Sequence, residues 1–159
     1  MPKIDLAKVP VKTGSIYPSP YREMMAGRSS LRVGEAGGLT QFGVNLVTLE
    51  PGARSSLRHW HLNEDEFVMV IEGECTLMQD AGPVIMRPGD CAAFPAGDPD
   101  GHCFVNHSGA IARFLVAGTR AQHEVATYSD VDLRVEMTPG ENGGARFTYW
   151  DGTDWAGPR

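Results

Sequence analysis

Short apolar runs separated by glycine or proline fill the middle of the chain. Seven of them have the length of a strand, and each is bounded by residues that favour turns. They are Gln41–Leu49, Phe67–Ile71, Cys75–Gln79, Val84–Arg87, Cys91–Phe94, His102–Asn106 and Ile111–Val116. Seven short strands within about 80 residues predict an all-β fold, either a sandwich or a barrel.

The segments on either side of this region are patterned differently. Residues 1–39 hold four prolines and end in a glycine cluster, so we expect an irregular arm that packs on the barrel core at 40–119. A serine–proline pair in this arm predicts one short helix over Tyr21–Ala26. Residues 120–159 form a C-terminal extension, which we expect to be loop apart from one alternating segment at Ala145–Trp150.

Composition and charge exclude two classes of partner. The 19 glycines and 11 prolines among 159 residues favour tight turns over long helices. With 14 basic and 20 acidic residues, the formal net charge of −6 lacks the basic footprint that nucleic acids and anionic lipids require. No apolar run approaches the roughly 18 residues that span a bilayer, so we expect no membrane partner and a cytoplasmic location.

Three histidines and one glutamate have spacings that converge in a β fold. Residues of a strand alternate between its faces, so His59 and His61 project together while Trp60 projects from the other face. A short bend then allows Glu66 to meet the pair, and His102 opens a later strand. Composition alone would produce this spacing of the histidine pair and glutamate only roughly 0.01 times in such a chain. Imidazoles and a carboxylate suit one divalent ion with open coordination positions, whether manganese, iron, nickel, zinc or copper.

Several apolar and amide residues are candidates for the wall of a pocket beside these ligands. Val68 and Val70 share the face of the ligand glutamate, and Phe104 and Asn106 share the face of the third histidine. We expect the two valines and Phe104 to make the pocket partly apolar. Asn106 either bonds within the pocket or satisfies backbone groups at the end of its strand.

Charged residues supply candidates for catalysis and substrate binding. All three lysines lie within the first twelve residues, so an anion site in the body of the chain must use arginine. Arg54, Arg58 and Arg113 are candidates for that anchor, unless they are solvated surface residues. Glu64 and Asp65 flank the ligand glutamate and act either as a general base or as exposed turn charges.

The other histidines and the cysteines are interpreted as structural. His107 and His123 lack the spacing of the ligand set, and His107 faces away from His102 in a continuous strand. Cys75, Cys91 and Cys103 contain no Cys-x-x-Cys pair, so we expect three reduced, buried thiols.

The same residues carry a family resemblance. The histidine pair and Glu66 between two glycines resemble the first signature motif of the cupins: Gly52, His59-Trp60-His61, Glu66 and Gly73. The second motif is matched by Gly89, Pro95, Gly97, His102 and Asn106. This sequence departs from the family pattern by one extra residue before His59 and two extra residues in the loop before His102.

This resemblance implies a double-stranded β-helix barrel of jelly-roll type. It also implies one divalent metal held in the lumen by His59, His61, Glu66 and His102. The flanking segments resemble single-domain bacterial cupins that carry a sugar-phosphate isomerase-like label.

Two functions fit these observations. A metal-dependent enzyme that acts on a small oxygenated metabolite, by isomerase-type or dioxygenase-type chemistry, is favoured by the open coordination positions. The alternative is a non-catalytic module that binds a sugar, a sugar phosphate or a sugar acid. We also expect a homodimer, because the outward apolar residues Phe67, Met69 and Ile71 need cover, unless the arm and the extension supply it.

Overall fold

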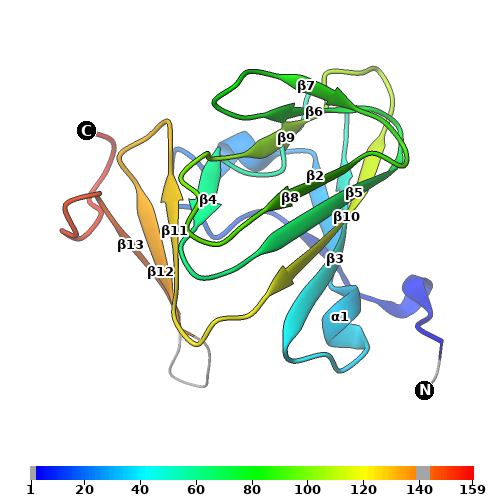
Figure 1. Ribbon diagram of the computed structural model, residues 1–159, viewed down its shortest axis with the longest axis horizontal. Helices are drawn as coiled ribbons and strands as arrows, with labels where there is room; N and C mark the ends of the chain where they lie inside the picture. Colours follow the sequence, from blue (N-terminus) through cyan, green and yellow to red (C-terminus); the bar gives the residue numbers. More distant parts are fainter. Residues whose placement is uncertain (1–2, 139–143) are drawn as a thin grey trace.

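The computed structural model describes residues 3–138 and 144–159, so residues 1–2 of the predicted arm and 139–143 of the extension lie outside the described residues. Short antiparallel strands are the main regular structure of the described chain, which confirms the all-β expectation (Figure 1). The strands are β1 (Val11–Thr13), β2 (Arg28–Leu31), β3 (Phe42–Leu49), β4 (His59–His61), β5 (Glu66–Glu72), β6 (Cys75–Met78), β7 (Val84–Met86), β8 (Cys91–Phe94), β9 (Cys103–Val105), β10 (Ala112–Thr119), β11 (Glu124–Tyr128), β12 (Arg134–Met137) and β13 (Ala145–Thr148). The helical elements are the α-helix α1 (Val33–Ala36) and two 3₁₀ turns, Leu6–Lys8 and Glu23–Met25. No helix in the described ranges has the length and apolar character that a membrane span requires.

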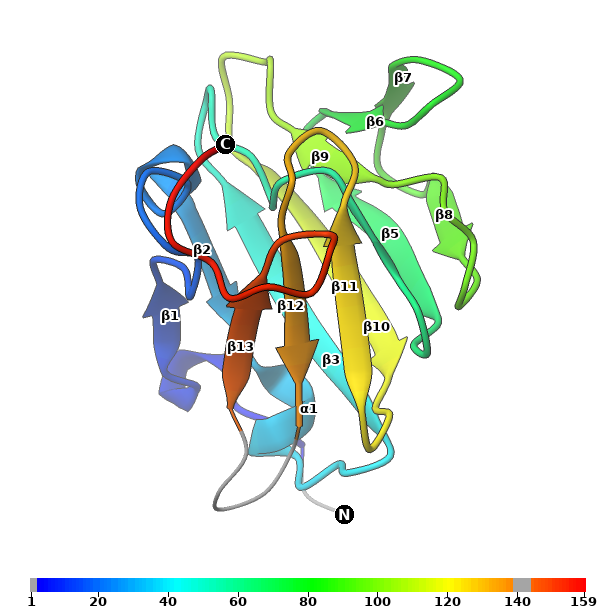
Figure 2. The ribbon, with the colours of Figure 1, turned by 90° about the vertical axis from the view of Figure 1, so that its left-hand side faces the viewer.

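Three sheets surround the interior of the barrel (Figure 2). The largest has six strands in the order β1-β2-β3-β10-β5-β8, the second has the order β13-β12-β11-β4, and the third has the order β7-β6-β9. Side chains alternate between the inner and outer faces, as the pattern of the sequence predicts. In β5, for example, Val68 and Val70 are buried, whereas Phe67, Met69 and Ile71 are exposed.

The turns predicted at glycines have a steric basis. Gly73 joins β5 to β6 with a positive φ of 72°, a conformation that residues with a side chain rarely adopt. A Cβ atom at this position would lie 2.2 Å from the carbonyl oxygen of Ile111. Only glycine therefore fits between β5 and the segment that enters β10.

The N-terminal arm is more regular than its prolines predict. Strand β2 pairs with β3, and β1 pairs with β2, so the arm extends the six-stranded sheet. The helix predicted over Tyr21–Ala26 is wrong, since this stretch holds only the 3₁₀ turn at Glu23–Met25. The Pro18 carbonyl accepts bonds from two successive backbone N–H groups, at 3.0 and 3.3 Å, which tightens the chain into a turn at this point.

The C-terminal extension contains two strands that the sequence pattern did not indicate. Strand β11 pairs with β4, which carries the histidine pair, and β12 connects β11 to the predicted strand β13. Four of the five residues of β11 are buried, so the strand lacks the alternation of apolar and polar residues by which half-buried strands are recognised.

Two clusters of buried side chains make up the core. The first contains Leu49, Val70, Met86 and Phe114 and lies within the six-stranded and three-stranded sheets. The second joins the arm to the extension, and its members include Tyr17, Met25, Leu57, Tyr128, Leu133 and Val135. The arm and the extension thus share one core, which closes the second side of the barrel.

The prediction of three buried thiols is correct for two cysteines. Cys75 and Cys103 are buried, but Cys91 is exposed. It is the first residue of β8, the edge strand of the six-stranded sheet, and it pairs with the outward-facing Met69. Position on the outer face of an edge strand explains its exposure.

Candidate metal centre

Three elements bring the four predicted ligands to one place inside the barrel. Strand β4 carries His59 and His61 on the same face, and β5 begins at Glu66. His102 stands just before β9 and forms an isolated bridge with His59, whose two backbone hydrogen bonds measure 2.8 and 3.1 Å. The ring of His102 also stacks on Phe94 with 3.5 Å between centroids.

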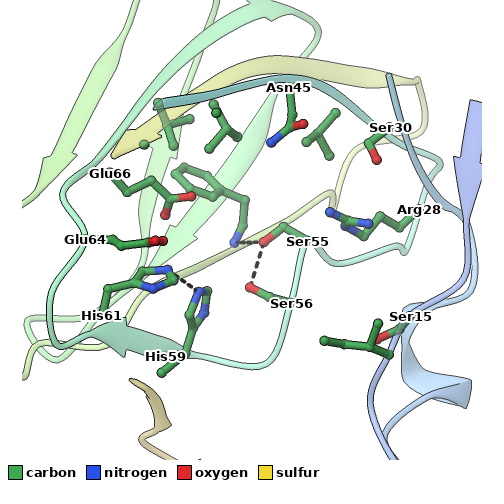
Figure 3. A pocket seen from close by; sticks show the side chains of 18 of the residues that line it. Ser15, Arg28, Ser30, Asn45, Ser55, Ser56, His59, His61, Glu64 and Glu66 are labelled. Carbon is green, nitrogen blue, oxygen red and sulfur yellow. Dashed lines mark hydrogen bonds between the residues drawn. The ribbon is translucent and has the colours of Figure 1, made fainter. Parts of the chain in front are cut away.

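The ring nitrogens of the histidine pair face each other (Figure 3). His59 Nδ1–H donates to the carbonyl oxygen of Leu57 at 2.9 Å, which leaves a lone pair on Nε2. That atom lies 3.1 Å from His61 Nε2. The donor atoms of His59, His61 and Glu66 all lie within 4.8 Å of one another.

This donor set fits a divalent metal. Two nitrogens bound at about 2.1 Å and at right angles to each other would lie about 3.0 Å apart, close to the 3.1 Å between the two Nε2 atoms. His102 Nε2 lies 2.6 Å from Glu66 Oε2, so the fourth predicted donor is next to the third. The buried Nδ1 of His102 has no hydrogen-bond partner among the described residues.

Burial and neighbouring charges shift the pKa values of the predicted ligands in opposite directions. Burial, reinforced by the other two imidazoles, lowers the pKa of His59 to about 3. Burial also acts to lower the pKa of His61, but the nearby carboxylates, Glu124 first, outweigh it and hold this pKa above its ordinary value. Burial acts to raise the pKa of Glu66, yet the hydrogen bond and charge of His102 keep that pKa below its usual range. A carboxylate that stays ionised beside a neutral imidazole is the state that a cation needs.

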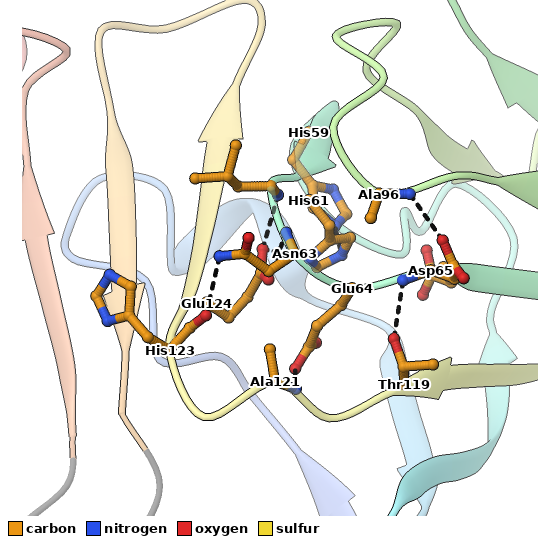
Figure 4. Close-up of polar contacts among 12 residues, drawn as sticks. His59, His61, Asn63, Glu64, Asp65, Ala96, Thr119, Ala121, His123 and Glu124 are labelled. Carbon is orange, nitrogen blue, oxygen red and sulfur yellow. Dashed lines mark hydrogen bonds and ion pairs between the residues drawn. The ribbon is translucent and has the colours of Figure 1, made fainter.

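Glu124 supports this centre and was missed from the sequence because its strand was taken as loop. Its side chain is 2% exposed, and its two oxygens accept the backbone N–H groups of Leu62 and Asn63, each at 2.9 Å (Figure 4). Oε1 lies 3.4 Å from His61 Nδ1. Glu124 therefore holds the bend after β4 and directs Nε2 of His61 inward. The β-branched and aromatic residues of Val125–Tyr128 were the signal for this strand.

The two acidic residues next to Glu66 are both held by backbone groups. Glu64 lines the pocket, and its Oε1 accepts the N–H of Ala121 at 2.8 Å. Partial burial raises its pKa above the ordinary value. Asp65 is exposed and accepts the N–H of Ala96 at 2.8 Å, as expected for a turn charge (Figure 4).

The predicted ligands line one end of a pocket of about 700 Å³. Val68 and Phe104 belong to its apolar wall, together with residues of both core clusters. Val70 and Asn106 are buried outside it. Asn106 instead fixes the turn after β9, since its Nδ2 donates to the carbonyl oxygens of Leu49 and Ala110 at 3.0 and 2.7 Å. The expectation that Asn106 binds within the pocket is therefore wrong, and its alternative, hydrogen bonding to backbone groups, is correct.

None of the three arginines proposed from the sequence lines this pocket. Arg58 binds Asp130 and Asp80, and these hydrogen bonds raise its pKa. Arg113 binds Glu72 at 2.5 Å. Arg54 forms an isolated backbone bridge with Val105 of β9. Three other arginines line the pocket instead: Arg28 of β2, Arg32 and Arg120.

A family model and several solved structures resemble this chain. The model described as a cupin domain matches residues 45–118, which span β4 to β9 and all four predicted ligands. No curated protein matches the sequence.

One solved structure resembles nearly the whole chain. It is a protein from Silicibacter pomeroyi DSS-3 described as a sugar phosphate isomerase from a cupin superfamily. The two are 56% identical, with a TM-score of 0.93, over 98% of this chain and 97% of the other. This match includes the arm and the extension.

Two more distant structures show the same fold. A protein from Acidithiobacillus ferrooxidans ATCC 23270 is 28% identical, with a TM-score of 0.72, over 81% of this chain and 80% of the other. A polyketide cyclase from Streptomyces resistomycificus is 22% identical, with a TM-score of 0.61, over 75% of this chain and 79% of the other. With the motifs, the barrel and the full-length match in agreement, the chain belongs to the cupin superfamily.

Proposed function

We propose that the protein is a metal-dependent enzyme that acts on a small oxygenated metabolite, by isomerase-type or dioxygenase-type chemistry. One observation carries the proposal: the facing Nε2 atoms of His59 and His61, 3.1 Å apart, open onto a pocket large enough for a small molecule. Structural metal sites are closed by protein ligands, whereas catalytic sites keep a position open.

Different side chains of the pocket would bind the metal, exclude water and exchange a proton. His59, His61, Glu66 and His102 would hold one divalent ion, which when bound supplies a Lewis acid that polarises a substrate oxygen. Val68 and Phe104 exclude water from one wall of the pocket, which strengthens electrostatic interactions there. Glu64 lies beside the ligands with a raised pKa and is placed to exchange a proton with a bound substrate.

No protein nucleophile is required by this proposal. Burial raises the pKa of Cys75 to about 11 and also raises that of Cys103, so both thiols stay protonated at neutral pH. Cys91 lies on the outer edge strand, away from the pocket.

The test is a screen of sugar isomerisation and oxygen uptake against a metabolite panel. Turnover is expected to vanish on chelation and to return when metal is added back. The Cys75→Ser, Cys91→Ser and Cys103→Ser variants are expected to keep it. Turnover that survives full metal removal and depends on one cysteine would contradict the proposal. If no turnover occurs, but a metabolite raises the melting temperature of metal-free and metal-loaded protein alike, the protein is a binding module.

The homodimer stays a prediction, as does the cytoplasmic location. Phe67, Met69 and Ile71 are 40, 39 and 50% exposed on the outer face of β5, so the described parts of the arm and extension leave them uncovered. A second copy would remove this apolar surface from water. Sedimentation at micromolar concentration is expected to give twice the 17.2 kDa of one chain. A single species at the monomer mass would contradict the dimer.

A further inference from the structure

Arg28 lies inside the pocket without a carboxylate partner. It belongs to β2, where it shares the inward face with Ser30, and both side chains line the pocket (Figure 3). Its Nε atom is buried and has no hydrogen-bond partner, and no ion pair of Arg28 exists among the described residues. Burial lowers its pKa, although an arginine remains charged at neutral pH. A partly buried guanidinium without a partner loses hydration with no compensation unless an anion binds it.

The other guanidinium groups at this pocket share one carboxylate partner. Arg32 Nη1 lies 3.2 Å from Glu35 Oε1, and Arg120 Nη2 lies 3.4 Å from the same oxygen. Arg28 is therefore the unpaired guanidinium of the pocket in the described part of the chain. The remaining cation of the lining, Lys12, stands on the exposed strand β1.

The surroundings of Arg28 suit a polyoxygenated ligand. Ser55 Oγ accepts the N–H of Phe104 at 2.9 Å and lies 3.2 Å from Ser56 Oγ, so one hydroxyl of this pair remains free to donate to a ligand. Asn45 of β3 adds an amide to the same lining. Figure 3 shows these polar groups between Arg28 on one side and the histidine pair on the other.

Arg28 and the predicted metal centre line the same pocket. Strand β2 is three positions from β5 in the order β2-β3-β10-β5, and both Arg28 and Glu66 contribute to the lining. The pocket volume of about 700 Å³ leaves room between them for a small molecule.

We propose that Arg28 binds the carboxylate of a small polyhydroxylated acid whose other end meets the predicted metal centre. One guanidinium presents two parallel N–H donors to a carboxylate and balances its single charge. A phosphate monoester carries up to two negative charges, and Glu64 and Glu66 at the other end of the pocket disfavour the second. This assignment of substrate class rests on the proposed function.

The test uses three probes with one carbon skeleton: D-glucose, D-glucuronate and D-glucose 6-phosphate. Calorimetric titration of wild-type protein is expected to give an affinity for glucuronate about 10- to 100-fold above that for glucose, as a charged hydrogen-bond pair predicts. Arg28→Gln removes this preference and leaves glucose binding unchanged, and Arg28→Lys retains part of it. Arg32→Gln, which changes the paired guanidinium four residues after Arg28 and just past the end of β2, is the matched control and keeps the preference.

Each other outcome overturns the proposal. A wild-type protein without a preference for glucuronate has no carboxylate site, and a preference that survives Arg28→Gln means that Arg28 is not the anchor. A stronger response to glucose 6-phosphate that Arg28→Gln abolishes makes the site a phosphate site. The titrations are repeated on metal-free protein with metal content measured separately. Failure of the metal centre then appears in the metal content alone, whereas failure of the arginine assignment appears in both sets of titrations.

Discussion

His61→Ala is expected to lower the affinity for a divalent metal by at least about 100-fold. Residues that only support a metal ligand contribute about 10- to 100-fold, so loss of a ligand atom costs at least the upper end of that range. The side chain supplies the Nε2 atom that faces His59 Nε2 at 3.1 Å, and nothing else in the described chain occupies that position. Metal content after equilibrium dialysis against a weak chelator is the measurement.

The matched control for this experiment is His107→Ala. His107 is exposed, and it lies outside both the ligand cluster and the pocket. Its removal changes the histidine count without changing the donor set, so metal content is expected to equal that of the wild-type protein. Wild-type occupancy in His61→Ala would show that the ion is held elsewhere or without this imidazole.

Metal affinity is also expected to fall by at least about 30-fold between pH 8 and pH 5. A protonated imidazole has no lone pair, so a proton competes with the ion wherever a ligand histidine titrates. The carboxylates around His61 hold its pKa above the ordinary value, so its competition begins near neutrality and grows about tenfold per pH unit below that pKa. His59, with its pKa lowered to about 3, and Glu66, with its pKa below the usual range, add no competition in this window.

Glu124→Gln separates the contribution of His61 from that of the other ligands. Loss of the carboxylate charge lowers the pKa of His61, so the acidic decline is expected to move to lower pH. The amide keeps one oxygen acceptor for the bend after β4, where the carboxylate now binds Leu62 and Asn63. Binding curves from competition with a chelator of known protonation behaviour measure both effects. A wild-type metal affinity that does not change from pH 8 to pH 5 would contradict the involvement of histidine ligands.

Local patterns in the sequence determined the strands of the barrel and the candidate metal ligands. Alternating or short apolar runs bounded by glycine and proline predicted strands at β3, β5 to β10 and β13, because backbone geometry alone sets the two-residue period. The same period placed His59 and His61 on one face of β4. The turn at Gly73 follows from a positive φ, which is also a local property.

Tertiary structure alone decided which charged side chains enter the pocket. The local sequence does not distinguish Arg28 from the three arginines that were proposed as anchors, Arg54, Arg58 and Arg113. Only the pairing of β2 with β3 turns the side chain of Arg28 inward. Glu124 reaches His61 because β11 pairs with β4 across more than sixty residues. Such long-range pairings depend on which surfaces become buried together, and a period along one strand carries no information about its neighbour.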